Sequence, residues 1–216
     1  DGNALQDLAA NGASPNAFTS SAITGYYFES TEKFEENLKI LLSFVSEPWF
    51  TPESVDKEQG IIGQEIRMIE DDPENQVFYG MMETLYVHNP IKVSIAGTVE
   101  SISHITADTL YACHAAFYNP GNMVLCVAGN VDPERICEIA REILPREGIA
   151  DIPRDYGGEE PETAAMPEKV QRMEVSTPIF QLGWKADAAP MGEERLRCQL
   201  MGELACEALF GTSTAL

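Results

Sequence analysis

The sequence predicts an α+β chain, because two short stretches typical of strands are followed by a series of helical patterns. Residues 17–20 and 23–30 are rich in aromatic and β-branched residues, so we predict two antiparallel strands that turn near residues 20–22. From residue 34 onward, apolar residues recur at intervals of three and four, which is the spacing of amphipathic helices. The composition, 44% hydrophobic and 23% charged, is that of an ordinary globular protein.

Capping residues and prolines divide the remaining part of the first 144 residues into further elements. The pair Asn11-Gly12 ends a short helix at the start of the chain. The apolar run 122–131 lies between two proline-containing turns and predicts a buried strand. The remaining predicted helices are 31–48 with Thr31 as N-cap, 51–72 with Thr51 as N-cap, 76–86, 106–118, and 133–144 with Asp132 as N-cap.

A change in composition predicts a domain boundary. Between residues 145 and 167 the chain is rich in Pro, Gly and Glu without periodicity, which indicates a linker. We therefore predict a first domain over 1–148, a linker over 149–167 and an incomplete second domain over 168–216. The last part contains predicted strands over 170–175 and 179–185 and a predicted helix over 193–210. One helix and two strands are too few to close a core of their own.

Charge and cysteine content limit the classes of function. The formal net charge of −21 opposes binding to phosphate backbones, so we expect no nucleic-acid partner. No apolar run approaches the ~20 residues that span a bilayer, so we expect no membrane segment. The five cysteines are odd in number and lack CxxC spacing. We expect them to be small buried side chains in a reducing cytoplasm.

Two acidic residues stand out in the predicted helix 51–72. Glu58 and Glu65 are seven residues apart, close to two helical turns, and therefore share one row. The neighbours of Glu65 at three and four residues are all apolar, and the row lies about 60° from the apolar stripe. We expect the two carboxylates to border the buried face, where a carboxylate normally needs a cation, a metal or strong donors. Alternatively, the two glutamates lie on a solvent-exposed side of the helix and only keep it soluble.

Other chemistry has weaker support in the sequence. The three histidines, His88, His104 and His114, include no pair at the i, i+4 spacing that places two imidazoles on one metal. We expect His114 to be a packing residue. There is no G-x-S-x-G elbow, P-loop or dinucleotide fingerprint.

Several motifs in a fixed order resemble the insulinase/pitrilysin family of zinc peptidases, which carry an inverted H-x-x-E-H motif and include mitochondrial processing peptidase. The resemblance is nearest to a bacterial processing-peptidase-like member. The matching segments are Asn16-Ala17-Phe18-Thr19-Ser20, Tyr26-Tyr27-Phe28, Glu58 with Glu65, Phe117-Tyr118-Asn119-Pro120-Gly121, and Val127-Ala128-Gly129-Asn130-Val131.

The resemblance implies a fold and a set of site residues. The fold is a mostly antiparallel sheet with helices on one face, followed by the start of a second similar domain. In the family, the H-x-x-E-H helix supplies two histidine ligands and a glutamate general base, and a later glutamate completes the zinc site. Glu65 matches that metal ligand, and Glu58 matches an additional acidic residue that supports the ligands. The residues that match the family's peptide-binding edge strand are Asn16, Ala17, Phe18 and Thr19, which an ordinary paired strand also explains.

The chain departs from the family in one respect, since its sequence contains no H-x-x-E-H. The resemblance places that motif just before Asp1. We therefore expect a fragment of a zinc endopeptidase that cleaves peptides or small unfolded polypeptides with metal-activated water. The fragment itself is expected to be inactive and without bound zinc. Its expected partners are a peptide substrate and the remaining domains of the parent or a homologous subunit.

Two other hypotheses stay open. The chain is alternatively a non-catalytic peptide-binding or scaffold subunit of the same family, or an acidic α+β domain with an unrelated role.

Overall fold

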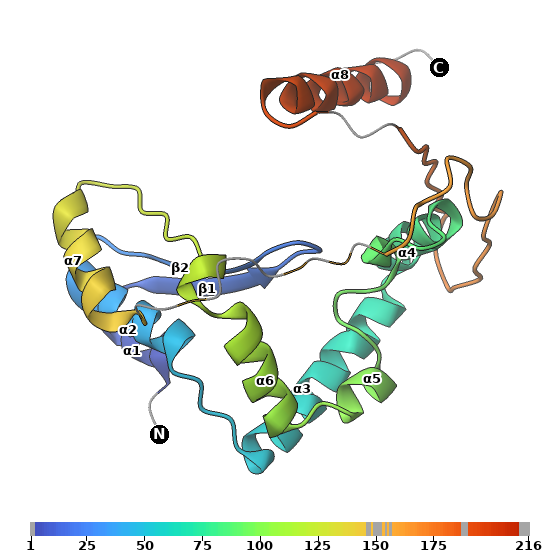
Figure 1. The fold of residues 1–216 in the computed structure, drawn as a ribbon. Helices are drawn as coiled ribbons and strands as arrows, with labels where there is room; N and C mark the ends of the chain where they lie inside the picture. The colour runs from blue at the N-terminus through green and yellow to red at the C-terminus, as the bar shows by residue number, and fades with distance from the viewer. Residues whose placement is uncertain are drawn as a thin grey trace.

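The structure is a computed structural model that describes residues 3–145, 148, 153, 155, 157–186 and 190–211. Its elements in chain order are α1 (Ala4–Ala10), β1 (Ser14–Thr19), β2 (Thr24–Glu29), α2 (Phe34–Ser46), α3 (Pro52–Asp71), α4 (Pro73–Leu85), η1 (Pro90–Lys92), α5 (Val99–Ser103), α6 (Ala107–Phe117), η2 (Pro120–Asn122), α7 (Pro133–Ile143) and α8 (Glu193–Phe210). Figure 1 shows α1, α2 and α7 together at one end of the β1–β2 hairpin, while α8 stands apart from them.

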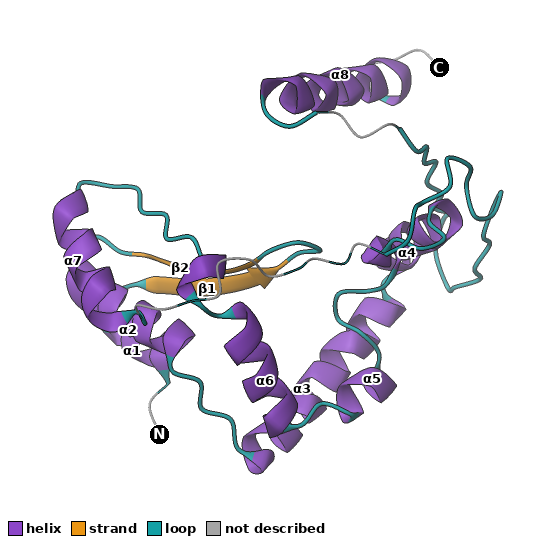
Figure 2. Cartoon of the chain, viewed as in Figure 1, coloured by secondary structure: helices purple, strands orange, loops and turns teal. Residues whose placement is uncertain are grey.

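The β1–β2 hairpin has helices on one face only. The strands pair antiparallel with Ala17 opposite Tyr26 and Phe18 opposite Gly25. Side chains alternate between the faces of a strand, so Tyr26 and Phe28 share the face that packs against helices. Tyr26 lies edge-on to Phe44 of α2, and Phe28 packs on the core of α2 and α7. The structure therefore confirms the predicted class, with helices on one face of an antiparallel sheet (Figure 2).

A cluster of buried side chains lies where α2 meets α7. Leu38 and Leu42 of α2 surround Ile139 of α7, with exposed fractions of 2%, 4% and 0%. Phe28 and Phe34 pack at the edge of this cluster with their rings 6.1 Å apart. Burial of a full aliphatic side chain stabilises a fold by about 1.5–3 kcal/mol, so this cluster holds the hairpin and the two helices together.

Helix boundaries follow the predictions except at α4 and α2. The hydroxyl of Thr51 accepts from the Ser54 N–H in a capping box at the start of α3, as predicted. Helix α4 starts at Pro73, three residues before the predicted start at 76, because Asp72 acts as its N-cap. Thr31 is not the N-cap of α2. That helix begins three residues later, after Lys33 in a left-handed conformation (φ 51°) and without a side-chain cap. The left-handed residue makes the turn from β2 into α2 and so displaces the helix start.

A polar aromatic cluster joins the hairpin to α6. The hydroxyls of Tyr26 and Tyr118 lie 2.6 Å apart, and the ring of His114 stacks on Tyr118 at 4.7 Å. The Nε2 atom of His114 is 2.8 Å from the Val45 carbonyl oxygen. His114 is thus a packing residue, as predicted. Burial, together with the bond to Tyr118, raises the pKa of Tyr26 above its ordinary value.

Three predicted strands are absent from the described residues. The run 122–131 starts in η2 and continues extended but unpaired, and Val124 in it is 88% exposed. Residues 170–175 and 179–185 are likewise extended without ladder partners. An extended backbone becomes a strand only when a neighbour pairs with it, and no such neighbour lies beside these runs in the described part of the chain. The prediction of a buried strand over 122–131 is therefore wrong for this structure.

The end of the chain is exposed. Helix α8 has the predicted bounds, 193–210, but none of its residues is buried. All five cysteines are free and exposed, so the expectation that they are buried is wrong. Two of them, Cys198 and Cys206, lie on α8, and Cys126 lies in the unpaired run. A search of the described residues finds no helix long and apolar enough to cross a bilayer. The division into 1–148, 149–167 and 168–216 stays a prediction.

Candidate functional site

Helix α3 presents the predicted acidic row on its open side. Both Glu58 and Glu65 are exposed, and neither has a hydrogen bond or ion pair within the described residues. This exposure differs from the expectation that the row borders a buried face. The reason is that two apolar neighbours of Glu65 on the helix, Ile61 and Met68, are themselves 51% and 72% exposed. The carboxylate of Glu65 is thus accessible and free to accept a cation.

The opposite side of α3 is fixed by contacts with α5. The buried residues of α3 are Val55, Gly63 and Ile66, which fall on one helical face. A Cβ added to Gly63 would lie 4.0 Å from Cδ1 of Ile102, so the glycine faces that side chain closely. This packing sets the rotation of α3 about its axis and therefore the direction of the acidic row.

One polar residue on the packed face was missed by the sequence interpretation. The Nε2 atom of Gln59 donates to the carbonyl oxygens of Ile102 at 2.9 Å and Ile105 at 2.8 Å. The Ile102 carbonyl at the end of α5 also accepts from the Ile105 N–H at 3.0 Å, whereas Gln59 is the donor that the structure gives the Ile105 carbonyl, just beyond the helix. Gln59 lies four residues from both Val55 and Gly63, so the sequence places it on the same helical face as these two residues. This position on the buried face could have identified Gln59 from the sequence.

The residues of this chain do not fit a complete zinc site. No group of three or more His, Cys, Asp or Glu side chains among the described residues is placed to hold a metal ion. A catalytic zinc ion takes three protein ligands and a water. Glu65 is a single exposed carboxylate, and His114 is engaged with Val45 and Tyr118.

The outer edge of β1 is the second candidate surface. The Ser20 N–H donates to the Ile23 carbonyl at 2.8 Å and closes the turn. Because bonded and non-bonded pairs alternate in an antiparallel ladder, the main-chain groups of Ala17 and Thr19 point away from β2. Pro15, which has no N–H, is at another outward position, so its presence removes no hydrogen bond between β1 and β2. The described residues contain no strand paired to this edge.

The side chains of β1 shape this edge. The Ala17 N–H donates to Oδ1 of the neighbouring Asn16 at 2.8 Å, so an intramolecular acceptor occupies one outward donor. Phe18 lies over Gly25, where an added Cβ would be 2.4 Å from Cε1 of the Phe18 ring. Its ring is 52% exposed and 6.4 Å from the ring of Tyr27 on the face without helices. Asn16 and Phe18 therefore flank the edge on one face, while Ala17 and Thr19 present small side chains on the other.

The structure does not bring the two candidate surfaces into direct contact. The hairpin packs on α1 and α2, whereas α3 packs on α4 and α5. No hydrogen bond or ion pair of the described residues joins β1 to Glu58 or Glu65. The role of these residues at one common site is therefore a proposal and not an observation.

Two family models match the chain in succession. The model described as Insulinase (Peptidase family M16) matches residues 2–99, and the model described as Peptidase M16 inactive domain matches residues 104–212. The chain therefore belongs to the insulinase, or M16, family of peptidases.

Relatives of the chain are named as zinc proteases. The chain is 44% identical over 218 residues to the uncharacterized zinc protease YmfH of Bacillus subtilis, a match that covers 100% of this chain and 51% of that protein. It is 30% identical over 141 residues to the uncharacterized zinc protease ML0855 of Mycobacterium leprae, covering 63% of this chain and 31% of that protein. The chain thus spans about half of the length of the first relative and about a third of the second.

Solved structures agree with this family. A crystal structure of an M16-like peptidase from Alicyclobacillus acidocaldarius matches with a TM-score of 0.80 and 33% identity, covering 98% of this chain and 51% of that one. A protease from Helicobacter pylori matches with a TM-score of 0.67 over 74% of this chain and 40% of that one, and its 21% identity shows likeness of fold alone.

Proposed function

We propose that this chain is part of a zinc-dependent endopeptidase that acts on peptides or small unfolded polypeptides. In this proposal the chain supplies the strand on which the peptide is bound and one acidic ligand of the metal. The names of its relatives support the peptidase class. The open main-chain edge of β1 carries the proposal for this chain, because an exposed strand edge binds an extended peptide without regard to its sequence.

Each candidate residue has a distinct role in this proposal. Thr19 binds the peptide backbone through its outward N–H and carbonyl, and Ala17 does so through its outward carbonyl, because its N–H is bonded to Asn16. Asn16 and Phe18 contact side chains on the face without helices. Glu65 provides one carboxylate ligand to zinc in the whole protein, where zinc supplies Lewis-acid chemistry. Glu58, two turns earlier on the same row, supports the ligands by hydrogen bonding.

The 216-residue chain alone is expected to hydrolyse nothing. Glu65 is one ligand where a catalytic zinc ion needs three, and the sequence has no H-x-x-E-H to add the others. We further propose a cytoplasmic location, which five free and exposed cysteines support because such thiols persist in a reducing compartment.

Proline substitutions test the peptide-binding edge. Thr19→Pro removes an outward N–H of β1, and Thr24→Pro is the matched control because Thr24 is opposite Thr19 at an outward position of β2. An extended peptide bound to the 216-residue chain is expected to lose at least about tenfold in affinity with Thr19→Pro and little with Thr24→Pro, measured by fluorescence anisotropy. Equal losses in both variants, with the hairpin retained by circular dichroism, would refute binding on β1.

Glutamate substitutions in the whole protein test the metal ligand. We expect Glu65→Gln to lower zinc affinity and peptide hydrolysis more than the roughly 10–100-fold expected for Glu58→Gln. Glu53→Gln, at an exposed position of the first turn of α3, is expected to leave both unchanged. Zinc content by mass spectrometry and activity with and without chelator provide the measurements. Unchanged zinc content in Glu65→Gln overturns the ligand assignment.

A non-catalytic peptide-binding or scaffold subunit of the same family is the second candidate. It is favoured by the match of residues 104–212 to a model described as an inactive domain. This candidate predicts that the peptide-binding test succeeds while the whole protein contains no zinc and hydrolyses no peptide. The two functions are therefore separated by the same pair of experiments.

A further inference from the structure

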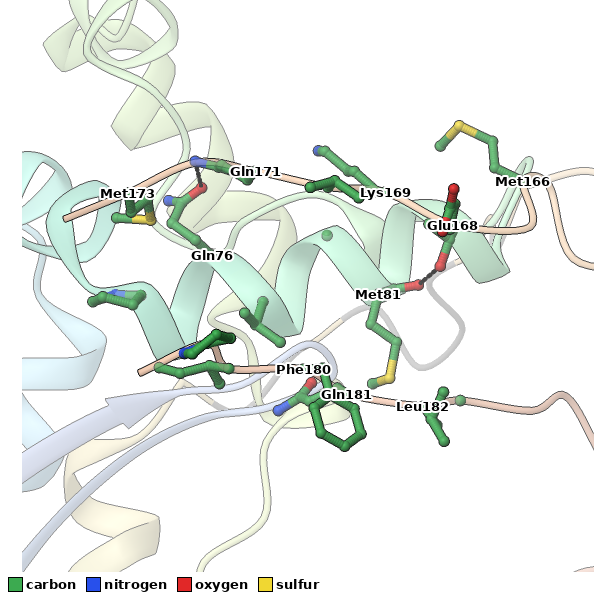
Figure 3. Close-up of a pocket in the computed structure, with 18 of the residues that line it drawn as sticks. Gln76, Met81, Met166, Glu168, Lys169, Gln171, Met173, Phe180, Gln181 and Leu182 are labelled. Atoms are coloured by element: carbon green, nitrogen blue, oxygen red, sulfur yellow. Dashed lines mark hydrogen bonds between the residues drawn. The ribbon is translucent and has the colours of Figure 1, made fainter. Parts of the chain in front are cut away.

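Residues 157–185, which include the end of the predicted linker, lie along α4 as two extended stretches; we call this segment the strap. Figure 3 shows one stretch, with Glu168 to Met173, on one side of α4 and a second, with Phe180 to Leu182, on another. Between them and α4 lies a cavity of about 800 Å³ lined by Met81, Met166 and Met173 among others. The strap is thus placed on the helix in a defined way although it has no regular secondary structure.

One carboxylate near the start of the strap receives an unusual set of hydrogen bonds. Oε1 of Glu160 accepts from the Val87 N–H at 2.6 Å, and Oε2 accepts from the N–H groups of His88 at 2.8 Å and Asn89 at 2.9 Å. These are three consecutive amides directly after α4. Successive main-chain N–H groups that converge in this way form an anion-binding nest.

A lysine from the far end of the strap completes the site. Nζ of Lys185 donates to Oε1 of Glu160 at 2.9 Å and to the carbonyl oxygens of Pro161 at 2.7 Å and Thr163 at 3.0 Å. The ammonium also lies 5.3 Å from the ring centre of Tyr86. The side chains of Lys185 and Glu160 are only 12% and 19% exposed, which makes this the least exposed ion pair among the described residues. Removal of one member would leave the other charge shielded from water without its partner.

Close approach of the strap to the same turn is possible because it carries glycine there. Gly157 has φ +85°, and a Cβ at this position would lie 2.8 Å from the carbonyl oxygen of His88. A side chain at residue 157 would therefore push the strap away from the nest. Gly192 has the similar φ of +86°, but no atom lies within 4 Å of its added Cβ.

The remaining attachments of the strap are exposed and weaker. The Met166 N–H donates to the Thr84 carbonyl at 3.0 Å, and Gln171 bonds to Gln76 at 3.1 Å. Lys169 forms an ion pair with Glu83, with side chains 36% and 43% exposed. Exposed ion pairs contribute little to stability. In addition to these polar contacts, the strap lies close against α4 at Gly183, where an added Cβ would be 2.8 Å from Cδ1 of Leu85 and from Sδ of Met81. Glu160 thus holds the strap by shielded polar contacts, whereas the strap's ion pair with α4 is exposed.

From this geometry we propose that Glu160 fastens the strap to α4. This one carboxylate, captured by the amides of residues 87–89 and by Lys185, decides whether the segment leading to α8 is held against the first part of the chain. The inference does not depend on the proposed peptidase function, since it concerns a contact within the chain and no ligand.

Limited proteolysis of the 216-residue chain tests the proposal. We expect Glu160→Gln to speed tryptic cleavage after Lys169 and Arg172 by about tenfold or more, the scale of a lost buried ion-pair contact. Glu159→Gln is the matched control, because the adjacent Glu159 is exposed, and its cleavage rate is expected to stay at that of the parent chain. Hydrogen exchange of the amides of residues 87–89 is expected to accelerate in Glu160→Gln only. Equal cleavage and exchange in the two variants would overturn the proposal.

A second pair of variants separates release of the strap from loss of the fold. Gly157→Ala is expected to release the strap by steric conflict with His88, whereas Gly192→Ala introduces the same backbone strain without that conflict. The released variants are expected to keep the helical circular dichroism of the parent chain. If Gly157→Ala leaves cleavage at Lys169 and Arg172 unchanged, or if Gly192→Ala accelerates it equally, the strap is not fastened at this turn.

Discussion

The chain contains two regions that are held in place by different forces. At the contact of α2 and α7, the side chains of Leu38, Leu42 and Ile139 are at most 4% exposed. In the region of the strap and α8, apolar side chains are open to water, as with Leu204 at 70% and Phe180 at 79%. The first region is organised by apolar burial, whereas the strap is held by hydrogen bonds to residues 87–89, by the shielded Glu160–Lys185 pair and by an ion pair to Glu83 of α4.

Because of this difference, the two regions should respond differently to substitutions that remove apolar volume and to substitutions that remove a charge. Loss of apolar volume should destabilise the region of α2 and α7, because the cavity and the lost transfer energy add together. The same loss on α8 should have little effect, since the side chains are already in water. Loss of a charge should act in the opposite way, because only the strap depends on a shielded ion pair.

The largest expected effect comes from the core. Leu38→Ala is expected to lower the free energy of unfolding by about 2–5 kcal/mol, as for other buried leucines. Leu204→Ala, at a leucine that is 70% exposed on α8, is expected to change it by less than about 0.5 kcal/mol. Urea unfolding followed by circular dichroism measures both. A loss of several kcal/mol in Leu204→Ala would show that α8 is buried in solution and would remove the contrast between the regions.

A smaller effect is expected where a polar contact supports the packed side of α3. Gln59→Ala removes the side-chain donor to the carbonyl groups of Ile102 and Ile105, of which Ile102 keeps the Ile105 N–H, and is expected to cost about 1–3 kcal/mol of unfolding free energy. Gln64→Ala is the control, because Gln64 is exposed on the same helix. The measurement is again urea unfolding. Equal values for the two variants would mean that apolar contacts alone fix α3 against α5.

The sequence allowed most helices to be predicted because their signals are local. Thr51 and Asp132 accept from amides two or three residues away, and the bounds of α8 followed from its flanking residues. The strand over 122–131 was predicted wrongly because pairing depends on a distant partner, which a single run of residues does not reveal. The expectation of buried cysteines failed for a related reason, since burial depends on what covers an element.

The candidate site also contains features that the sequence predicts and features that only the tertiary structure shows. The spacing of Glu58 and Glu65 placed both on one row of α3, but their exposure depends on the surroundings and was not predicted. Glu160 gave no signal at all, because its stretch lacks periodicity and its amide donors are 71–73 residues away in the chain. Contacts of this kind come from tertiary structure and are visible only once the chain has folded.

The smallest expected effect is the response of the strap to pH. Partial burial by itself would raise the pKa of Glu160, but the Val87 N–H, Lys185 and the amides of His88 and Asn89 outweigh it and lower the pKa from 4.5 to about 2. Because the pKa is lower in the folded state, the stabilising contribution is fully present above pH 4.5 and is lost as the pH falls towards 2. The attachment of the strap should therefore not change between pH 8 and 5.

The amide proton chemical shifts of residues 87–89, whose N–H groups donate to Glu160, can follow this attachment by NMR. We expect constant shifts from pH 8 to 5, and a change only as the pH approaches that of Glu160 protonation. Glu160→Gln should remove this titration, because the amide cannot become charged. A transition of the parent chain centred between pH 4 and 5 would instead mean that the pKa of Glu160 keeps its ordinary value of 4.5, and that the nest does not hold its carboxylate in solution.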